Sequence, residues 1–456
     1  MKTIFFVING KARVNFILRS DLFKILKNKD FKIVIISPFW QNPDFTLEFG
    51  GPNIFFEPLK SLRRSVAFKI VALRARALSW PHPELKKARE ISRFMDRRFQ
   101  KSPAWLLAAR SFVRDFILKL LPRPVKKSEK FWMALLKLSI SKTYADWLFE
   151  KYRPGLVILG NGGGDGYEIP FLVSAYFRGA ASVAVDANLD AATYRHFGAL
   201  FPATLWAIFG EPQKREFIEI HKVPESSLAV TGALRYDNYF RDFKPLPREE
   251  FFKRIGADPR KKLITLGAKT PLVFPHNQDI IKIILDAIGT KEFGGAELLV
   301  RFDPGHDPKP YGALLDKILW ERSENSSEEG HLKNLLCHSD VYLGLGATTL
   351  SIEACAMNTP ACWIGFDGFT KYPDRRLSCR LQYDLAVFQR IIKSGAIDLI
   401  ESKEALVGWI ARCLKNPDYN LKAREEMLRR EYFNAKDGLS GRRIADLAIK
   451  LISYDS

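Results

Sequence analysis

Runs of apolar residues with the length of buried strands alternate along the chain with segments of helical period. The first run covers residues 2–8. A loop follows, then a helical pattern over residues 15–29 and a second apolar run at 31–39. The order strand, loop, helix, strand is the usual opening of a doubly wound α/β domain.

The same rhythm resumes at residue 144 and is interrupted once more near residue 250. Helical patterns separate the later strands, and one of these predicts a helix over YGALLDKILWE, residues 311–321. The predicted strands are 156–160, 181–186, 203–210 and 227–232, then 262–268, 297–302, 340–346 and 360–366. The pattern therefore predicts two α/β halves.

The stretch between the halves, residues 241–262, contains three prolines and many charges, as a linker does. We therefore expect a first domain at 1–240 and a second at 263–435, with a helical C-terminal segment at 436–456. A total of 456 residues suits two such domains.

Charge is concentrated in one part of the first domain. The chain has a net charge of +20, and residues 60–142 hold 22 Lys or Arg against 5 Asp or Glu. Basic and apolar residues, three tryptophans among them, interleave there at helical spacing. This predicts a basic helical insertion, which suits an anionic membrane surface, a solvated helical layer or nucleic acid. Because no nucleic-acid recognition motif accompanies it, we expect nucleic acid not to be the partner.

Other features narrow the class of protein. Five cysteines without a CxxC pair argue against a disulfide framework or a structural zinc site. The apolar start is too short for a signal peptide, and no uncharged apolar run is long enough to span a membrane. We expect a cytoplasmic protein, peripheral at the inner face of the membrane, with no metal site and no cofactor.

The strongest candidate for chemistry lies at residues 340–367, DVYLGLGATTLSIEACAMNTPACWIGFD. A strand runs into a small-residue turn at Gly346, and Thr348, Thr349 and Ser351 open a helix. Free amide groups and the positive dipole end suit a diphosphate there. Glu353, one turn on, can accept hydrogen bonds from a ribose. The alternative is an ordinary capped helix with a solvated glutamate.

This segment resembles the nucleotide site of the GT-B glycosyltransferases, a group that includes CDP-glycerol glycerophosphotransferases and UDP-N-acetylglucosamine 2-epimerases. Residues 206–240, 263–275, 298–308 and 437–451 also resemble segments of those proteins, in the same order. The resemblance implies two Rossmann-like domains facing a central cleft, with the donor nucleotide on the second. It also implies that segment 436–456 packs back on the first.

One departure affects the phosphate site. The Arg-x-His-Pro turn of these proteins reads Arg301-Phe302-Asp303-Pro304 here, and His306 is a possible substitute for the missing histidine. Arg301 should follow its strand into the cleft, where it pairs with phosphate or with a surface carboxylate. Lys269 either neutralises the leaving diphosphate or is a solvated loop lysine.

The first domain supplies the acceptor-side candidates. Its NGGGDG loop is not a dinucleotide fingerprint, but it allows a ligand close to the backbone, unless it is only a flexible turn. Asp190 is the first choice for a catalytic base and His196 the second; an Asp-rich turn is the alternative. The remaining candidates are Asp186 for catalysis, and Gly163, Gly164, Asp165 and Arg13 for the acceptor.

The leading hypothesis is a metal-independent glycosyltransferase that uses a nucleotide-sugar donor. Its acceptor would be a cell-envelope or lipid-linked glycan at the membrane surface. Glycerophosphate transfer from a CDP-activated donor is the alternative enzyme. A non-catalytic protein that binds anionic membrane or RNA is the contrasting class.

Overall fold

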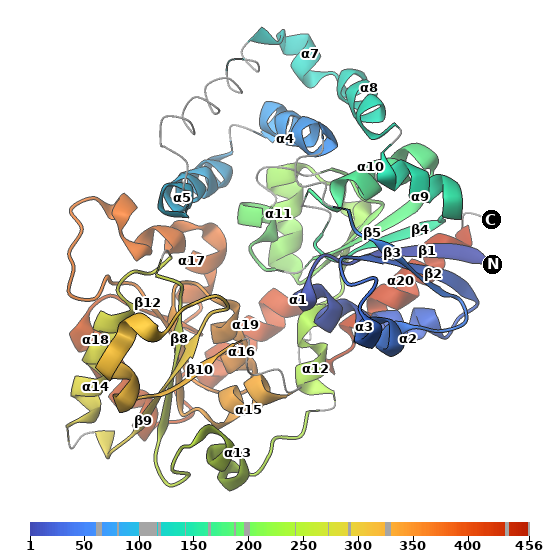
Figure 1. Ribbon diagram of the computed structural model, residues 1–456. Coiled ribbons are helices and arrows are strands. Elements are labelled where there is room, and N and C mark those ends of the chain that lie inside the picture. Colours follow the sequence, from blue (N-terminus) through green and yellow to red (C-terminus); the bar gives the residue numbers. More distant parts are fainter. Residues whose placement is uncertain are drawn as a thin grey trace. The chain divides into compact units, whose positions relative to one another are not determined.

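The computed structural model describes most of the chain as two compact units, coloured along the sequence in Figure 1. Unit 1 comprises Met1–Ala88, Ser102–Phe240 and Arg430–Ser456, and unit 2 comprises Arg89–Lys101 and Arg241–Arg429. The described residues are 1–60, 66–79, 82–99, 116, 120–141, 143–162, 166–186, 188–195, 201–241, 243–271, 273–290, 293–323, 330–433 and 437–454.

Unit 1 is built on a parallel sheet of seven strands in the order β3-β2-β1-β4-β5-β6-β7. Its two halves extend outward from β1 and β4, which is the doubly wound arrangement. The strands are β1 (Lys2–Val7), β2 (Phe31–Ser37), β3 (Ile54–Pro58), β4 (Leu156–Leu159), β5 (Ala181–Val185), β6 (Leu205–Ile208) and β7 (Leu228–Val230).

Helices cover both faces of this sheet (Figure 1). One face packs on α4, α8, α9 and α10, and the other on α2, α3 and α20. The helices are α1 (Lys11–Arg13), α2 (Asp21–Lys27), α3 (Pro43–Phe49), α4 (Val66–Ser79), α7 (Arg123–Lys127), α8 (Glu129–Ile140), α9 (Tyr144–Tyr152), α10 (Ile169–Arg178), α11 (Glu211–His221), α12 (Asp237–Phe240) and α20 (Ser440–Tyr454). Helix α5 (Pro83–Phe99) lies across the sequence boundary at residue 88.

Unit 2 holds a parallel sheet of six strands in the order β10-β9-β8-β11-β12-β13. Its strands are β8 (Leu263–Ala268), β9 (Glu297–Phe302), β10 (Leu319–Arg322), β11 (Val341–Leu345), β12 (Ala361–Ile364) and β13 (Asp398–Ile400). Its helices are α13 (Arg248–Ile255), α14 (Asn277–Ile288), α15 (His331–His338), α16 (Thr349–Ala356), α17 (Ala386–Lys393), α18 (Lys403–Lys415) and most of α19 (Leu421–Tyr432). Two parallel α/β sheets were predicted, and this fold class is confirmed.

The predicted linker 241–262 contains a structured element. Helix α13 buries Phe251 and Phe252 against Leu299 and Leu335 of unit 2. Proline and charge gave the stretch the composition of a linker, but the adjacent phenylalanines supply an apolar face that packs. The described part of this stretch therefore belongs to the second unit.

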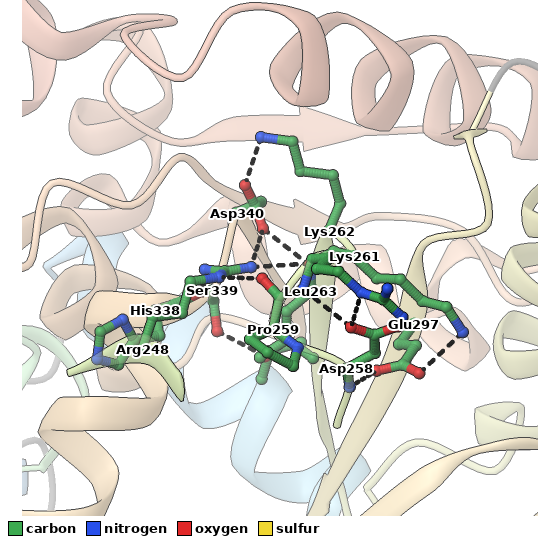
Figure 2. A network of polar contacts seen from close by, with 12 residues as sticks. Arg248, Asp258, Pro259, Lys261, Lys262, Leu263, Glu297, His338, Ser339 and Asp340 are labelled. Carbon is green, nitrogen blue, oxygen red and sulfur yellow. Dashed lines mark hydrogen bonds and ion pairs between the residues drawn. The ribbon is translucent and has the colours of Figure 1, made fainter. Parts of the chain in front are cut away.

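A polar network fixes this stretch to the amino-terminal edge of the second sheet (Figure 2). Arg248 donates to the carbonyls of Pro259 at 2.9 Å, Lys261 at 2.8 Å and His338 at 3.0 Å. Asp340, just before β11, accepts from the Leu263 amide at 2.8 Å and from Lys262 Nζ at 2.9 Å. The network holds the starts of β8 and β11 together, at the edge opposite the strands' carboxyl ends.

The helix predicted over residues 311–321 is wrong in its second half. Residues Lys309–Lys317 form a 3-10 segment interrupted at Gly312, and Leu319–Arg322 is strand β10, paired with β9. The apolar spacing of this stretch is helical, but parallel pairing with β9 overrides it. Glu321 therefore sits in the sheet and not on a helix.

Candidate functional site

The two faces of the second sheet have different chemistry. One face is apolar and packs on α14 and α18, with Leu266, Val300 and Leu343 at its centre. The other face carries Thr265, Gly267, Arg301, Tyr342 and Gly344, because neighbouring residues of a strand point to opposite faces. Polar and small residues on a buried sheet face indicate that this face carries the candidate site.

A lateral row on the polar face joins four strands. Arg301 of β9 is the register partner of Glu321 in β10 and of Gly267 in β8, and Gly267 is the partner of Gly344 in β11. The Arg301 guanidinium forms an ion pair with Glu321. Arg301 thus lies at the carboxyl ends of the strands, where ligands of such sheets bind.

His331 completes this ion-pair cluster. Its Nε2 lies 2.6 Å from the second carboxylate oxygen of Glu321. Burial alone would raise the pKa of Glu321, but the hydrogen bond with His331 and the charge of Arg301 outweigh it, so that pKa is lowered. Arg301 is therefore paired with a buried glutamate, and its pairing with phosphate stays a prediction.

The two glycines of the row make room for hydroxyl groups. A Cβ on Gly267 would lie 2.0 Å from Tyr342 Oη, and a Cβ on Gly344 would lie 2.6 Å from Ser351 Oγ. Ser351 is fully buried, and its hydroxyl has no hydrogen-bond partner among the described residues. An unsatisfied buried hydroxyl is costly, and a functional site is one setting that explains it.

The groups around this space can be identified from their effect on the pKa of Tyr342. Burial raises the pKa of its hydroxyl, the carboxylates of Asp303 and Glu353 raise it further, and Thr348 and Arg301 act in the opposite direction. Groups from β9, β11 and α16 are thus within electrostatic reach of one hydroxyl.

The turn between β11 and α16 has the predicted shape. Gly346 has φ +85°, a conformation that side chains rarely adopt, and Thr348 caps the helix by accepting from the Leu350 amide at 3.0 Å. Thr349 is the first helical residue, and Glu353 is buried one turn into the helix. Glu353 is therefore not a solvated glutamate.

Gln382 covers one side of this turn. Its Oε1 accepts from the Ala347 amide at 3.3 Å, and a Cβ on Gly346 would lie 2.9 Å from that oxygen. The 3-10 segment that carries Gln382 is held by Asp367, which accepts from the Cys379 amide at 3.0 Å. One turn amide is thus already occupied by a protein group.

Lys269 follows β8 and is not merely solvated. Its Nζ lies 3.2 Å from Asp303 Oδ2, and Asn277 fixes its backbone through hydrogen bonds of 3.1 and 2.9 Å. His306 is buried, and Tyr311 Oη lies 3.1 Å from its Nε2. Burial lowers the pKa of His306, which keeps it neutral near pH 7.

The first-unit candidates are described in part. Asp186 is buried, and its Oδ2 accepts from Gln213 Nε2 at 3.1 Å. Asp190 is half-buried in the following turn, where its carbonyl accepts from Thr193. Arg13 donates to Asn161, which follows β4. The candidates His196, Gly163, Gly164 and Asp165 lie outside the described residues.

The structure thus brings several predicted residues together at the carboxyl-terminal ends of the strands of one sheet, with Lys269 beside Asp303 at the same end: Arg301, Gly346, Thr348, Thr349, Ser351 and Glu353. Sequence reasoning missed Gly267, Glu321, Tyr342 and Gln382. Gly267 and Glu321 are register partners of Arg301, and Tyr342 lies two residues before Gly344 on the same strand. Because strand pairing is not visible in the local sequence, no local pattern points to these residues or to Gln382.

Two features are absent from the described residues. No group of three or more His, Cys, Asp or Glu among them is arranged to hold a metal ion. No described helix is both long and apolar enough to cross a membrane.

Comparisons with known proteins agree on the fold. No protein-family model matches the sequence, and no curated protein matches it. Among solved structures, the chain is similar to a putative UDP-N-acetylglucosamine 2-epimerase from Listeria monocytogenes, with a TM-score of 0.57, 14% identity and coverage of 100% of this chain and 98% of the other.

Two further structures show the same likeness. The UDP-GlcNAc 2-epimerase from Neisseria meningitidis, bound to UDP-GlcNAc, gives a TM-score of 0.54 at 12% identity, with coverage of 98% and 100%. A glycosyltransferase from Rickettsia africae gives 0.51 at 12% identity, with coverage of 99% and 98%. With its two parallel sheets, the chain therefore has the two-domain α/β fold of the GT-B type.

Proposed function

We propose that this protein is a glycosyltransferase that uses a nucleotide-sugar donor, and that unit 2 binds the donor's nucleoside diphosphate. The single observation that carries the proposal is the turn between β11 and α16. It combines a left-handed glycine, a capped helix start and a buried hydroxyl that has no hydrogen-bond partner in the described part of the chain.

The turn offers groups that a diphosphate needs. The first amides of a helix have no partner within the helix, and the dipole adds positive potential at that end. Thr348, Thr349 and Ser351 add hydroxyls at the same place. Glu353, buried on the same helix, is suited to accept hydrogen bonds from the two ribose hydroxyls.

Lys269 and Arg301 would stabilise the charge that develops on the departing diphosphate. Arg301 lies near the end of β9 and Lys269 directly follows β8 of the same sheet, so the fold holds the backbone of both residues in place. Fixed cations and helix amides can perform this task alone, so we expect activity without an added metal ion.

Transfer also needs a base to take the proton of the acceptor hydroxyl, and we assign it to unit 1. Asp190 remains the first choice and His196 the second. Asp186 ranks below them, because its carboxylate already accepts from Gln213.

We further propose that the acceptor is a cell-envelope or lipid-linked glycan at the membrane surface. Helix α8 supports this, because Lys130, Lys137 and Leu138 share its exposed face, opposite buried Trp132 and Leu136. Leu138 is 75% exposed. Exposed lysine beside exposed leucine suits an anionic interface. Binding to neutral vesicles as strong as to anionic ones would contradict this part of the proposal.

The solved structures support nucleotide-sugar chemistry, since those named above are described as UDP-GlcNAc epimerases or a glycosyltransferase. We prefer transfer to epimerisation because the acidic and histidine pattern of the epimerases is not evident in this sequence. The preference for transfer rests on this sequence alone.

A thermal-shift panel of UDP, GDP, CDP and dTDP, with their sugars and CDP-glycerol, tests the proposal. A ligand at 100 times its Kd stabilises the folded state by about 2.7 kcal/mol, which is readily measured. We expect one base to stand out and Glu353→Gln to weaken its binding, while exposed Glu404→Gln does not. No response to any nucleotide would overturn the proposal, and CDP-glycerol as the sole ligand would favour glycerophosphate transfer.

A further inference from the structure

Asp303 occupies a position that affects the charge of the proposed phosphate site. It directly follows β9, and its Oδ2 lies 3.2 Å from Lys269 Nζ. The two side chains are 27% and 26% exposed, so both can meet a ligand from solvent. The Asp303 carboxylate is also among the groups that raise the pKa of Tyr342, which places it within electrostatic reach of the polar face.

The second cation of the site, Arg301, also forms an ion pair with a carboxylate. Arg301 is paired with Glu321, which is held in turn by His331. Burial lowers the pKa of His306, the buried neighbour of Asp303, and so favours its neutral form. The charges of Lys269 and Arg301 are therefore each balanced by a neighbouring carboxylate.

The diphosphates that could bind at such a site differ in the charge of their terminal phosphate. A diphosphate esterified at both ends, as in a nucleotide sugar, carries two negative charges. A nucleoside diphosphate has a free terminal phosphate whose second ionisation lies near pH 6, so it carries close to three charges at pH 7.5. A fixed carboxylate nearby repels the third charge, and the interaction falls off slowly in a partly buried site.

We propose that Asp303 is a specificity-determining residue that makes the site favour a doubly esterified diphosphate over a free nucleoside diphosphate. Lys269 leaves Asp303 to pair with the ligand, and the Asp303 carboxylate then faces the end of the diphosphate. Sugar transfer converts the two-charge donor into the three-charge product, so the same carboxylate promotes product release. This inference rests on the proposed function, because it assumes that the diphosphate lies beside Lys269.

The test uses two probes that differ by one charge and lack the sugar that would be transferred. These are the nucleoside diphosphate whose base binds best in the panel of four, and its methyl ester at the terminal phosphate. Calorimetry gives the Kd of each for the wild type, for Asp303→Asn and for Asp307→Asn. Asp307, four residues on, is exposed and accepts a hydrogen bond from the backbone amide of Lys309. Its substitution removes one negative charge from the same turn and serves as the control.

We expect Asp303→Asn to shift the ratio of the two Kd values about tenfold in favour of the free diphosphate. Asp307→Asn should shift it by less than about twofold. The Asp303 backbone carbonyl, which accepts from the His306 amide, is kept in the asparagine variant, so we expect an unchanged fold. Binding of both probes with an unchanged ratio would overturn this inference alone. Failure of all four nucleoside diphosphates to bind would overturn the proposed function and this inference with it.

Discussion

The sheets of the two units have the same parallel topology but bury their faces differently. In unit 1 both faces of β1 are apolar, with Phe5 on one and Phe6 on the other, and both residues are fully buried. In unit 2 the apolar face of β8 carries Leu266, whereas its other face carries Thr265 and Gly267 after Leu263. A parallel sheet is normally apolar on both faces, so the polar face of unit 2 is the departure that needs a reason.

The difference indicates which sheet faces serve the stability of the fold and which face serves function. A strand core that is apolar on both faces contributes burial and little else. The polar face of unit 2 gives up part of that burial, and it is there that Arg301, Tyr342 and Ser351 meet the β11–α16 turn. The most economical explanation is that this face serves a ligand.

The largest expected effect tests how the faces of the two sheets differ in burial. Phe5→Ala and Phe6→Ala should each lower the free energy of unfolding by about 3–5 kcal/mol, since both rings are fully buried. In unit 2, Leu266→Ala should cost about 2–5 kcal/mol but Thr265→Ala only about 1 kcal/mol, the value of its contact with Ser339. Urea denaturation measures all four. Equal costs at Leu266 and Thr265 would remove the contrast between the sheets.

The next effect concerns the buried ion pair. Glu321→Gln should lower the free energy of unfolding by about 3 kcal/mol at pH 7, because it leaves the Arg301 charge without its counter-ion. The pKa of Glu321 is lowered in the folded state, so its stabilising contribution is present above the unfolded pKa of about 4.3 and is lost as pH falls through the folded value. The gap between wild type and variant should therefore shrink in denaturation curves below pH 4. A gap that widens with acid would contradict this assignment.

A smaller effect sharpens the role of the glycines. Gly267→Ala places a Cβ 2.0 Å from Tyr342 Oη, so the tyrosine must move, at a cost of about 2 kcal/mol. Tyr342→Phe removes that oxygen and should recover part of the loss, which a double-mutant cycle would measure. Full additivity of the two substitutions would show that the clash is not the cause.

These residues also show how far the sequence alone could go. Strand periodicity predicted both sheets, and the run from Gly346 to Glu353 predicted the turn and helix, because those signals are local. The partners of Arg301 and Lys269 depend on which strands lie side by side, which no local pattern specifies. Glu321 was placed on a helix for the same reason, since its apolar neighbours have helical spacing and only the pairing of β10 with β9 makes them a strand.

The smallest effect compares two serines that share one feature. Ser174 on α10 and Ser351 on α16 are both fully buried, and among the described residues neither hydroxyl has a hydrogen-bond partner. Either serine→alanine substitution should change the free energy of unfolding by less than about 1 kcal/mol, and in the stabilising direction, because an unsatisfied polar group is removed. Nucleotide affinity should separate them: we expect Ser351→Ala to weaken binding about fivefold, the value of one lost hydrogen bond, and Ser174→Ala to leave it unchanged. Calorimetric titration would decide between them. If both variants bind as the wild type does, Ser351 makes no contact with the nucleotide, and its unsatisfied hydroxyl is a packing feature like that of Ser174.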